Sequence, residues 1–267
     1  MPATKLKPLL AEIRACQVCA AHLPHGPRPV LSAGKEARLL IIGQTPGRRV
    51  HESGVPWQDQ SGDTLREWLQ LTPEQFYDER MVVIVPSGFC YPGKGVSGDL
   101  PPRPECAPLW HPRLLAVLPD IRLTLLVGSY AQAYYLSDQA KPTLTETVAS
   151  FAEYLPRYFP LPHPSPRNRP WLSRNRWFAT EAMPVLRERI ATVLPSHQLN
   201  RVRVVLINDR IITDQITARG RDDLGADIVP DEARGHPLAP QETIDRIVAE
   251  PRTMIREIGQ RVVDLTG

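Results

Sequence analysis

The chain lacks a long run of apolar residues, and no stretch approaches the roughly 20 residues that a membrane-spanning helix needs. Its first ten residues, MPATKLKPLL, contain two lysines, but their apolar run is too short for a signal peptide. Internal repeats and low-complexity tracts are absent as well. We therefore expect a soluble, cytoplasmic protein.

The chain also has little net charge. A formal charge of +3 over 267 residues neither demands nor excludes an anionic partner. The 29 prolines lie between apolar periodic segments, which favours a loop-rich enzyme over a disordered chain. The length allows a core domain with an extension, and a change of composition predicts a domain at 1–194 followed by a C-terminal extension at 195–267.

Cysteines are few, and without a secretion signal the four of them point to a metal or to free thiols rather than to disulfides. Cys16 and Cys19 form a Cys-x-x-Cys at the end of a predicted short helix, and Cys90 and Cys106 flank a loop rich in glycine and proline. Four thiolates suit a structural zinc or a [4Fe–4S] cluster, and the wide second spacing favours the cluster. Four buried, reduced cysteines are the alternative.

Short apolar segments alternate with helical ones along the first two thirds of the chain. Strands are predicted at 39–42, 81–85, 123–127 and 158–161, and helices at 61–71, 130–136 and 178–194. This alternation predicts an α/β fold with three layers, α/β/α, around a mostly parallel sheet. Unusual loops follow all four strands, and the first reads Gly43-Gln44-Thr45-Pro46-Gly47. Because ligands bind beyond the carboxyl ends of parallel strands, these loops are expected to form one cleft.

Two helix starts have recognisable signals. Ser61 or Asp63 is expected near the cap of the helix at 61–71. Thr72-Pro73-Glu74-Gln75 reads as a helix start with a capping box and proline at the first position.

Several of these motifs together carry a family resemblance. The Cys-x-x-Cys, the Gly-x-x-Pro-Gly loop after the first strand, the spacing of the second cysteine pair and a late His-Pro-Ser at 163–165 resemble the uracil-DNA glycosylase superfamily. The nearest branch is the iron–sulfur, family 4 type, and the resemblance covers roughly residues 9–194. It implies the three-layer fold, a [4Fe–4S] cluster on the four cysteines, and hydrolysis of the N-glycosidic bond of a deaminated base, uracil being one candidate, in DNA base-excision repair.

The resemblance also implies roles for particular residues. Trp57 would stack on the flipped base, His163 would donate a hydrogen bond to the departing base, and Gly43 and Thr45 would contact the base. The implied partner is DNA that contains damaged bases, with single-stranded DNA as one alternative. A basic stretch that contains tryptophans follows His163. Its predicted DNA-binding residues are Ser165, Arg167, Asn168 and Arg169, with Arg174 and Arg176 behind them. The simpler interpretations are a loop histidine, a core tryptophan and a solvated basic surface.

The first loop departs from the family pattern, which reads Gly-Glu-Ala-Pro-Gly. Gln44 and Thr45 stand where the family has a glutamate and an alanine, and neither side chain is a carboxylate base. Gln44 would instead offer hydrogen bonds to the base or to water. Water activation could pass to His51, Glu52, Asp59 or Asp63, and His51 is favoured because its ordinary pKa lies near neutrality.

A second departure follows the strand at 81–85. Pro86 stands where the family has an asparagine that reads uracil, and proline offers neither a side-chain amide nor a backbone N–H. Ser87 or a nearby backbone group would have to substitute. Either the base preference has shifted, or the chain is a nucleic-acid-binding protein without catalysis. A zinc-stabilised α/β protein with an unrelated small substrate is a third hypothesis.

The extension has its own pattern. Residues 201–208 read as a strand, 210–236 as loop, and 240–265 as two short amphipathic helices interrupted by Pro251. Such helices need an apolar partner surface, which could lie on the core, on another protein or on a second copy of the chain. The acidic pairs in the loop are interpreted as solvated charges rather than as a metal site.

Overall fold

The structure is a computed structural model that describes residues 5–96, 98–194, 201–207 and 210–216, the last two ranges for their backbone alone. The chain divides into two units, Met1–Ser196 and His197–Gly267, and each is described by itself. Among the described residues, no helix has the length and apolar character needed to cross a membrane.

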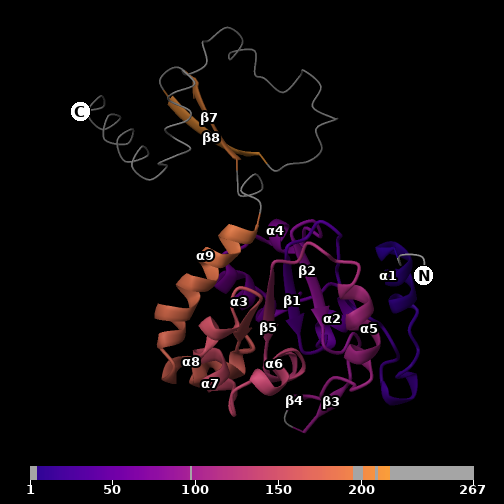
Figure 1. Ribbon diagram of the computed structural model, residues 1–267. Coiled ribbons are helices and arrows are strands. Elements are labelled where there is room, and N and C mark those ends of the chain that lie inside the picture. The colour runs from indigo at the N-terminus through magenta and orange to yellow at the C-terminus, as the bar shows by residue number, and fades with distance from the viewer. Residues whose placement is uncertain (1–4, 97, 195–200, 208–209, 217–267) are drawn as a thin grey trace. The chain divides into compact units, whose positions relative to one another are not determined.

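A four-stranded parallel sheet forms the centre of the first unit (Figure 1). Its strand order is β2-β1-β5-β6, with β1 at Leu39–Gly43, β2 at Val82–Pro86, β5 at Leu123–Val127 and β6 at Tyr158–Leu161. The four strands predicted from apolar runs are confirmed, and so is the parallel sheet. Since β1 lies between β2 and β5, the chain changes direction across the sheet at β1, where α/β sheets open a crevice.

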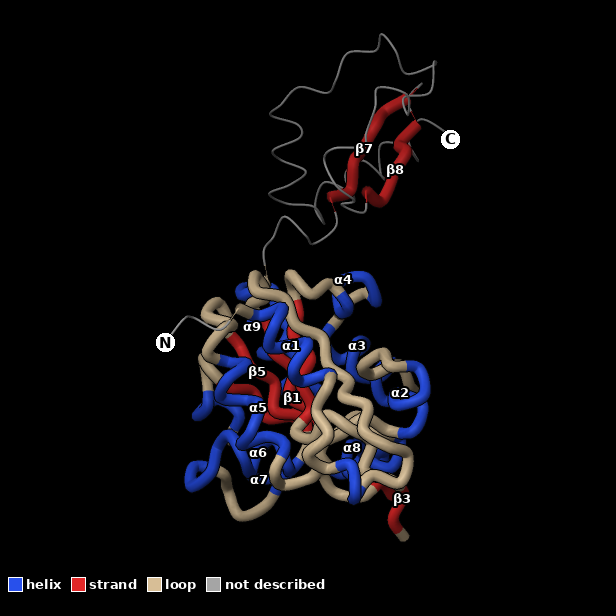
Figure 2. The backbone as a smooth tube through the Cα atoms, turned by 90° about the vertical axis from the view of Figure 1, so that its right-hand side faces the viewer, coloured by secondary structure: helices blue, strands red, loops and turns tan. Residues whose placement is uncertain are grey.

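Helices cover both faces of this sheet, which confirms the three layers (Figure 2). Leu39 and Ile41 face one core, while Leu40 and Ile42 face the other, because side chains alternate along a strand. The first core receives side chains from α3 (Gln60–Leu69), α4 (Pro73–Tyr77), α7 (Leu144–Ala149) and α9 (Met183–Val193). The second receives them from α1 (Leu6–Arg14), α5 (Cys106–Leu115) and α6 (Ser129–Leu136).

Smaller elements lie in the loops between strands and helices. They are α2 (Arg48–Ser53), α8 (Arg169–Arg174), and a hairpin of β3 (Lys94–Gly95) and β4 (Gly98–Asp99). The predicted helix at 178–194 begins with a π-helical turn at Phe178–Ala182 before α9.

The helix starts are partly as predicted. The capping box of α4 is confirmed, with Thr72 accepting from the Gln75 N–H and the Gln75 side chain accepting from the Thr72 N–H. For α3, the helix begins at Gln60 and Asp59 is the cap itself, so Ser61 and Asp63 lie in the first turn, near the cap as expected. Asp59 accepts from the Gly62 N–H at 2.9 Å.

The free edge of β2 is covered by the chain that precedes β1. Ser32 forms an antiparallel bridge with Ile84, and the Val30 N–H donates to the Phe89 carbonyl at 2.8 Å. This pairing satisfies backbone groups that an open edge would expose, and it brings Val30 to the carboxyl end of β2.

In the second unit, the structure describes two strands. The strand predicted at 201–208 is confirmed as β7 (Arg201–Ile207). The loop predicted at 210–236 is wrong in its first part, because Arg210–Ile216 forms β8, antiparallel to β7. Its sequence, RIITDQI, is rich in β-branched residues, which favour strands. The helices predicted at 240–265 lie outside the described residues.

His111 on α5 is a buried polar residue behind the end of β2, with 2% of its surface exposed. Its Nε2 lies 3.1 Å from the Pro86 carbonyl oxygen and its Nδ1 lies 2.7 Å from the Tyr135 hydroxyl. A carbonyl only accepts, so Nε2 carries the proton and Nδ1 accepts from Tyr135. Burial lowers the pKa of His111 to about 4, which keeps the ring neutral.

This burial predicts a loss of stability in acid. The unfolded histidine binds a proton below its ordinary pKa of 6.5, whereas the folded one does not until about pH 4. The contribution of His111 is therefore complete above pH 6.5, and about 3 kcal/mol is lost as the pH falls to 4. Urea unfolding across this range measures the effect. His111→Gln keeps a side-chain donor without titrating, so its unfolding free energy should fall less steeply, and equal slopes would contradict the assignment.

Candidate functional site

A cavity of about 500 Å³ opens beyond the carboxyl ends of β1, β2 and β6. Its volume lies within the range of small-ligand sites. The predicted convergence of loops is seen for the segments after these three strands, but the segment after β5 contributes no residue to the cavity lining. The lining residues are Val30, Gly43, Gln44, Thr45, Pro46, Gly47, Val50, Pro56, Trp57, Asp59, Ser61, Ile84, Pro86, Gly98, Asp99, His163, Ser165, Arg167 and Asn168.

Hydrogen bonds join the first two of these loops. The Ser87 N–H and the Ser87 hydroxyl both donate to the Gly43 carbonyl at 2.9 Å, and the Gly88 N–H donates to the Gln44 carbonyl at 3.0 Å. In a trans peptide the C=O and the following N–H point in opposite directions. The N–H groups of Gln44 and Thr45 therefore point away from the β2 loop.

Trp57 lines the cavity in an uncommon backbone conformation, with φ of +56°. Two glycines make room for it. A Cβ on Gly43 would lie 2.9 Å from Cζ2 of the ring, and a Cβ on Gly62 would lie 1.8 Å from the Trp57 carbonyl oxygen. A left-handed backbone costs a bulky residue free energy and is maintained only where its surroundings impose it, which is frequent at functional sites.

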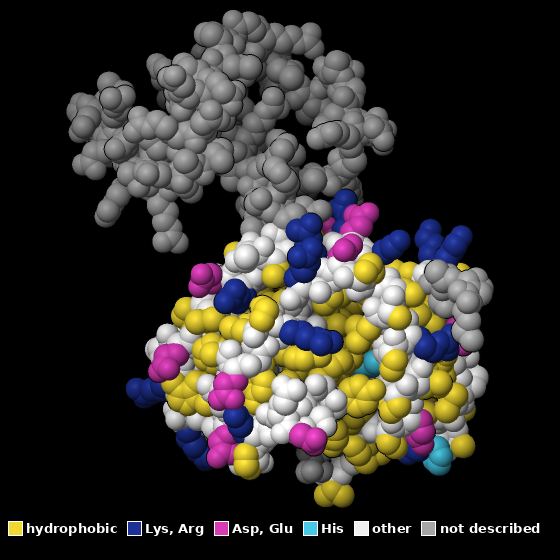
Figure 3. Space-filling model, viewed as in Figure 1, with side chains coloured by type: hydrophobic (Ala, Val, Ile, Leu, Met, Phe, Trp, Pro, Cys, Tyr) yellow, Lys and Arg dark blue, Asp and Glu magenta, His cyan; other side chains and the backbone are white. Residues whose placement is uncertain are grey.

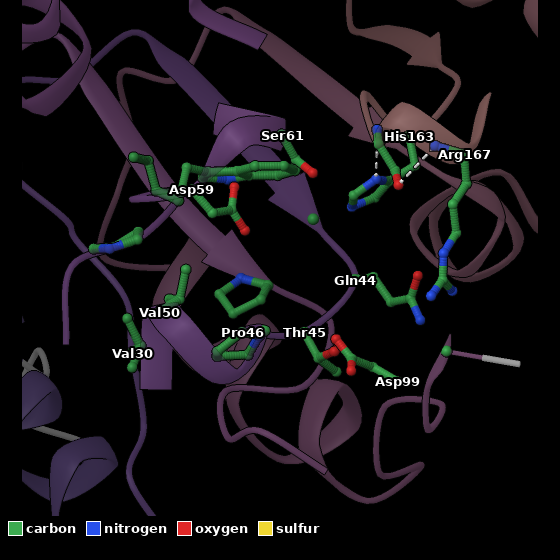
Figure 4. Close-up of a pocket in the computed structure, with 18 of the residues that line it drawn as sticks. Val30, Gln44, Thr45, Pro46, Val50, Asp59, Ser61, Asp99, His163 and Arg167 are labelled. Atoms are coloured by element: carbon green, nitrogen blue, oxygen red, sulfur yellow. Dashed lines mark hydrogen bonds between the residues drawn. The ribbon is translucent and has the colours of Figure 1, made fainter. Parts of the chain in front are cut away.

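His163 lies beside Trp57, with ring centroids 5.5 Å apart and planes tilted by 32°. The Ser165 N–H donates to its Nδ1 at 3.2 Å, and the Asn168 side chain donates to its backbone carbonyl at 2.7 Å (Figure 4). With Nδ1 accepting, the neutral ring carries its proton on Nε2. Burial lowers the pKa of His163, and the nearby Asp59 carboxylate opposes that shift.

Two carboxylates flank the first loop. A Cβ on Gly47 would lie 3.6 Å from Oδ2 of Asp99 and 3.9 Å from Oδ2 of Asp59. Oδ1 of Asp59 caps α3, so Oδ2 is the oxygen that faces the loop. Partial loss of solvent raises the pKa of Asp99, and Asp59 adds to this rise, whereas Arg167 and Lys94 oppose it. Figure 4 shows Asp59 and His163 directed into the same cavity.

The segment after His163 forms another wall. Ser165, Arg167 and Asn168 line the cavity, and the Ser165 hydroxyl accepts from the Arg167 N–H at 3.3 Å. Figure 4 shows the Gln44 amide directed toward the Arg167 guanidinium. The side-chain amide of Asn168, which was predicted to contact DNA, donates to the His163 carbonyl.

His51, Ser87 and Arg169 were predicted for catalysis, base binding and DNA binding, but they do not line the cavity. His51 lies on α2, with its ring 6.0 Å from that of His25 and 5.9 Å from that of Tyr91, and burial lowers its pKa. Ser87 is buried under the loop and bonded to Gly43. Arg169 is exposed at the start of α8.

The four cysteines border a second, much smaller cavity of about 20 Å³. All four are free thiols. Leu23, Phe89 and Trp110 also line it and contribute an apolar wall. Within the described residues, no three His, Cys, Asp or Glu side chains have the arrangement of a metal site, so the cysteines are assembled without the geometry of a bound cluster.

The thiols of Cys90 and Cys106 are partly shielded from water. Burial raises the pKa of Cys90 to about 11 and that of Cys106 to about 12. The Phe89 N–H donates to Cys106 Sγ at 3.3 Å. Four thiols that share one small apolar cavity are a donor set that suits zinc or an iron–sulfur cluster.

Sequence reasoning missed part of this site. Asp99 was not singled out, although it is the one acid in the glycine-rich loop between Cys90 and Glu105. Asp59 was considered and passed over in favour of His51. Asp59 lies at the cavity because it caps α3. The loop motif at 43–47 does not predict where that helix begins.

Comparison with known protein families agrees with this architecture. The family model described as the Uracil DNA glycosylase superfamily matches residues 31–187, more than half of the chain. The match includes all four strands of the sheet and every cavity-lining residue except Val30. Cys16 and Cys19 lie before the matched range, and Cys90 and Cys106 lie within it. The chain belongs to the uracil DNA glycosylase superfamily.

Proposed function

We propose that this protein is a DNA glycosylase that hydrolyses the N-glycosidic bond of a deaminated base, with uracil the first candidate, in base-excision repair. Membership of the superfamily implies a DNA substrate. The observation that carries the proposal is a neutral His163 with its Nε2 proton in a cavity shared with Trp57 and Asp59. A target base must leave the helix stack, and such a cavity would hold it.

His163 would stabilise the departing base. As the glycosidic bond breaks, its electron pair moves onto the base, which becomes an anion. A hydrogen bond from the Nε2–H to a carbonyl oxygen of the base stabilises that charge more strongly in a water-poor site than in solvent. Burial favours this role because it lowers the pKa of His163 and keeps the ring a neutral donor.

Asp59 would supply the basic group that Gln44 cannot. Its Oδ2 would accept a proton from water as the water oxygen bonds to C1′ of the sugar, while the base leaves with the bonding electrons. Asp59 lines the cavity and faces the Gly47 loop. We propose Asp59 in place of His51, because the His51 ring packs against His25 and Tyr91 outside the cavity lining.

The base would be recognised mainly from the first loop. Pro86 has no N–H, its carbonyl is bonded to His111, and both Ser87 donors are directed to Gly43. The Gln44 amide and the N–H groups of Gln44 and Thr45 remain as donors in the cavity wall. Trp57 would stack on the base. Arg167 and the exposed Arg169 would contact phosphates.

We further propose the iron–sulfur, family 4 type, with Cys16, Cys19, Cys90 and Cys106 holding a [4Fe–4S] cluster. The shared cavity and the bond from the Phe89 N–H to Cys106 support this assignment. The cluster would be structural, since hydrolysis transfers no electrons; it would tie the chain after α1 to the start of α5.

A non-catalytic DNA-binding protein on the same fold is the second candidate. The absence of a carboxylate at Gln44 and of an amide at Pro86 favours it. It predicts salt-dependent DNA binding without base release.

Replacing His163 tests the proposed chemistry. His163→Ala should lower single-turnover release of uracil from a labelled oligonucleotide by about 10²–10³-fold, because one donor to the developing anion is lost. DNA binding should persist. His163→Gln retains an N–H donor and should recover part of the rate. If His163→Ala releases the base at the wild-type rate, the assigned role is wrong.

Replacing Asp59 tests the water-activating group. Asp59→Asn can still cap α3, because asparagine is also a good N-cap, but it cannot accept the proton. We expect base release to fall by about 10²-fold or more, with little change in the urea midpoint. Asp63→Asn is the matched control, since Asp63 lies on the same helix outside the cavity lining. Equal rates for Asp59→Asn and the wild type would remove Asp59 from the mechanism.

The cysteine assignment predicts that metal content and stability fall together. Purified protein should be brown, with visible absorbance and iron in elemental analysis. Cys16→Ser should lose iron and unfold at lower denaturant, because one of four ligands is removed. Zinc in place of iron would identify a structural zinc site, and a stable, fully metallated variant would refute the ligand role of Cys16.

A further inference from the structure

The small cavity that the four cysteines border is also lined by an arginine. Arg103 lies just before α5, and its side chain faces the same space as the thiols. The cavity measures only about 20 Å³, little more than the room of one water molecule, so the side chains that line it lie close together. Arg103 is therefore placed to act on whatever the thiols bind.

One nitrogen of this arginine is a buried donor without an acceptor. Nη2 of Arg103 donates to Oε1 of Glu105 at 2.7 Å, and the side chain as a whole is 31% exposed. Its Nε is buried and has no hydrogen-bond partner among the residues that the structure describes. Arginine keeps its proton in proteins, so this N–H is always a donor. A buried donor of this kind is rare and costs free energy, and an ion bound beside it is one of the known explanations.

Glu105 shows when such a donor is needed. The Cys19 thiol donates to Oε2 of Glu105, with 4.0 Å between the sulfur and the oxygen. Only the protonated thiol can make this bond. When a metal binds, the thiol proton is released to solvent, and the sulfur becomes an anionic acceptor that faces a carboxylate. The Nε–H of Arg103 is a donor in the same cavity that can replace the lost bond.

The charge of the occupied site also favours a nearby cation. Four thiolates outweigh the positive charge of a zinc ion or of a [4Fe–4S] core, so the centre is anionic. Over the face that Figure 3 shows, Lys and Arg side chains lie interspersed with Asp and Glu side chains. The effects of distant surface charges of both signs largely cancel and are screened by salt. The charge balance at the cysteines therefore depends mainly on Arg103 and Glu105.

We propose that Arg103 stabilises the metal-bound form of the cysteine site, with its Nε–H donating to the sulfur of Cys19. The inference rests on the metal centre proposed above. Arg103 would be a positioning residue that does not ligate the metal. Its hydrogen bond would replace the one that Cys19 makes to Glu105 as a thiol, while its Nη2 keeps the Glu105 carboxylate paired. Hydrogen bonds to ligating sulfur strengthen metal retention and, in an iron–sulfur cluster, raise the reduction potential.

The test uses variants of the full chain, purified with its metal. Arg103→Gln removes the cation and the Nε donor, whereas Arg103→Lys keeps the charge without the Nε. Arg80→Gln is the matched control, because Nη2 of Arg80 also pairs at 2.7 Å with an acid two residues away, Asp78, and Arg80 does not line the cysteine cavity. Elemental analysis gives the metal content. Metal loss to excess chelator is followed by visible absorbance for iron and by a metal-binding dye for zinc.

Arg103→Gln should lose its metal about tenfold faster than the wild type. The reduction potential of an iron–sulfur cluster should become more negative in this variant, because an anionic centre without its donor accepts an electron less readily. Arg103→Lys should recover part of both properties, and Arg80→Gln should match the wild type. Wild-type metal loss and potential in Arg103→Gln, or an equal change in Arg80→Gln, would overturn the proposal.

Glu105→Gln gives a prediction of the opposite sign. It removes the carboxylate beside Cys19, so metal should be lost more slowly than from the wild type and the potential should rise. A variant that folds poorly can only lose metal faster, so slower loss supports the charge-based role. Faster loss from Glu105→Gln as well as from Arg103→Gln would show that this segment matters for folding alone, and it would refute the inference.

These measurements contain no DNA, so they are separate from the test of the glycosylase. A wild type that holds its metal, together with an unchanged Arg103→Gln, refutes the role of Arg103 and leaves both the metal centre and base release untouched. A wild type that binds neither iron nor zinc refutes the metal centre and this inference with it, while the base-release assays still decide the proposed function.

Discussion

The bonds from Ser87 and Gly88 to the carbonyls of Gly43 and Gln44 are the constraint on which the site depends. They join the loops after β1 and β2, where Gly43 and Pro86 are already register partners in the parallel sheet. With the Gly43 carbonyl held in this way, the following backbone N–H groups point away from β2. His111 completes the support by holding the Pro86 carbonyl from behind. Backbone conformation, rather than a charged side chain, therefore shapes this wall of the cavity.

The two positions that differ from the family pattern, Gln44 and Pro86, lie close together because β1 and β2 are paired. Gln44 follows Gly43, and Gly43 pairs with Pro86, so a carboxylate and an amide are missing from adjoining parts of one wall. Two carboxylates lie near the same loop, because Asp59 and Asp99 approach Gly47 from a helix cap and from a hairpin. In our proposal the acid has moved from the loop itself to elements that pack against it.

Much of the fold was predictable from sequence for a simple reason. Strands of a parallel sheet are buried on both faces, so LLII at 39–42 and LTLLV at 123–127 stand out as apolar runs. The convergence of Gln44 and His163 also follows from the pattern, since parallel strands bring their carboxyl ends to one edge. The start of α3 did not follow, because Asp59, one residue before the helix, provides the cap. The strand at Arg210–Ile216 was missed because residues 210–236 were interpreted together as a loop rich in Asp, Arg and Gly, although several of the first of them are β-branched.

The positions of His51 and Asp99 could not be predicted from the sequence for a different reason. His51 was expected in a loop, but residues 48–53 form α2, and its N–H donates to the Gly47 carbonyl at 2.8 Å. This turn directs the ring toward His25 and Tyr91. Asp99 reaches the cavity because β3 pairs with β4. Each of these strands has only two residues, which is too short to be predicted from the sequence pattern.

A crystal structure with uracil or an abasic-site oligonucleotide bound tests the central claim most directly. The account predicts the base in the cavity beyond β1, β2 and β6, stacked on Trp57, with a carbonyl oxygen within hydrogen-bond distance of His163 Nε2. A base bound elsewhere, or one that His163 does not contact, would contradict it.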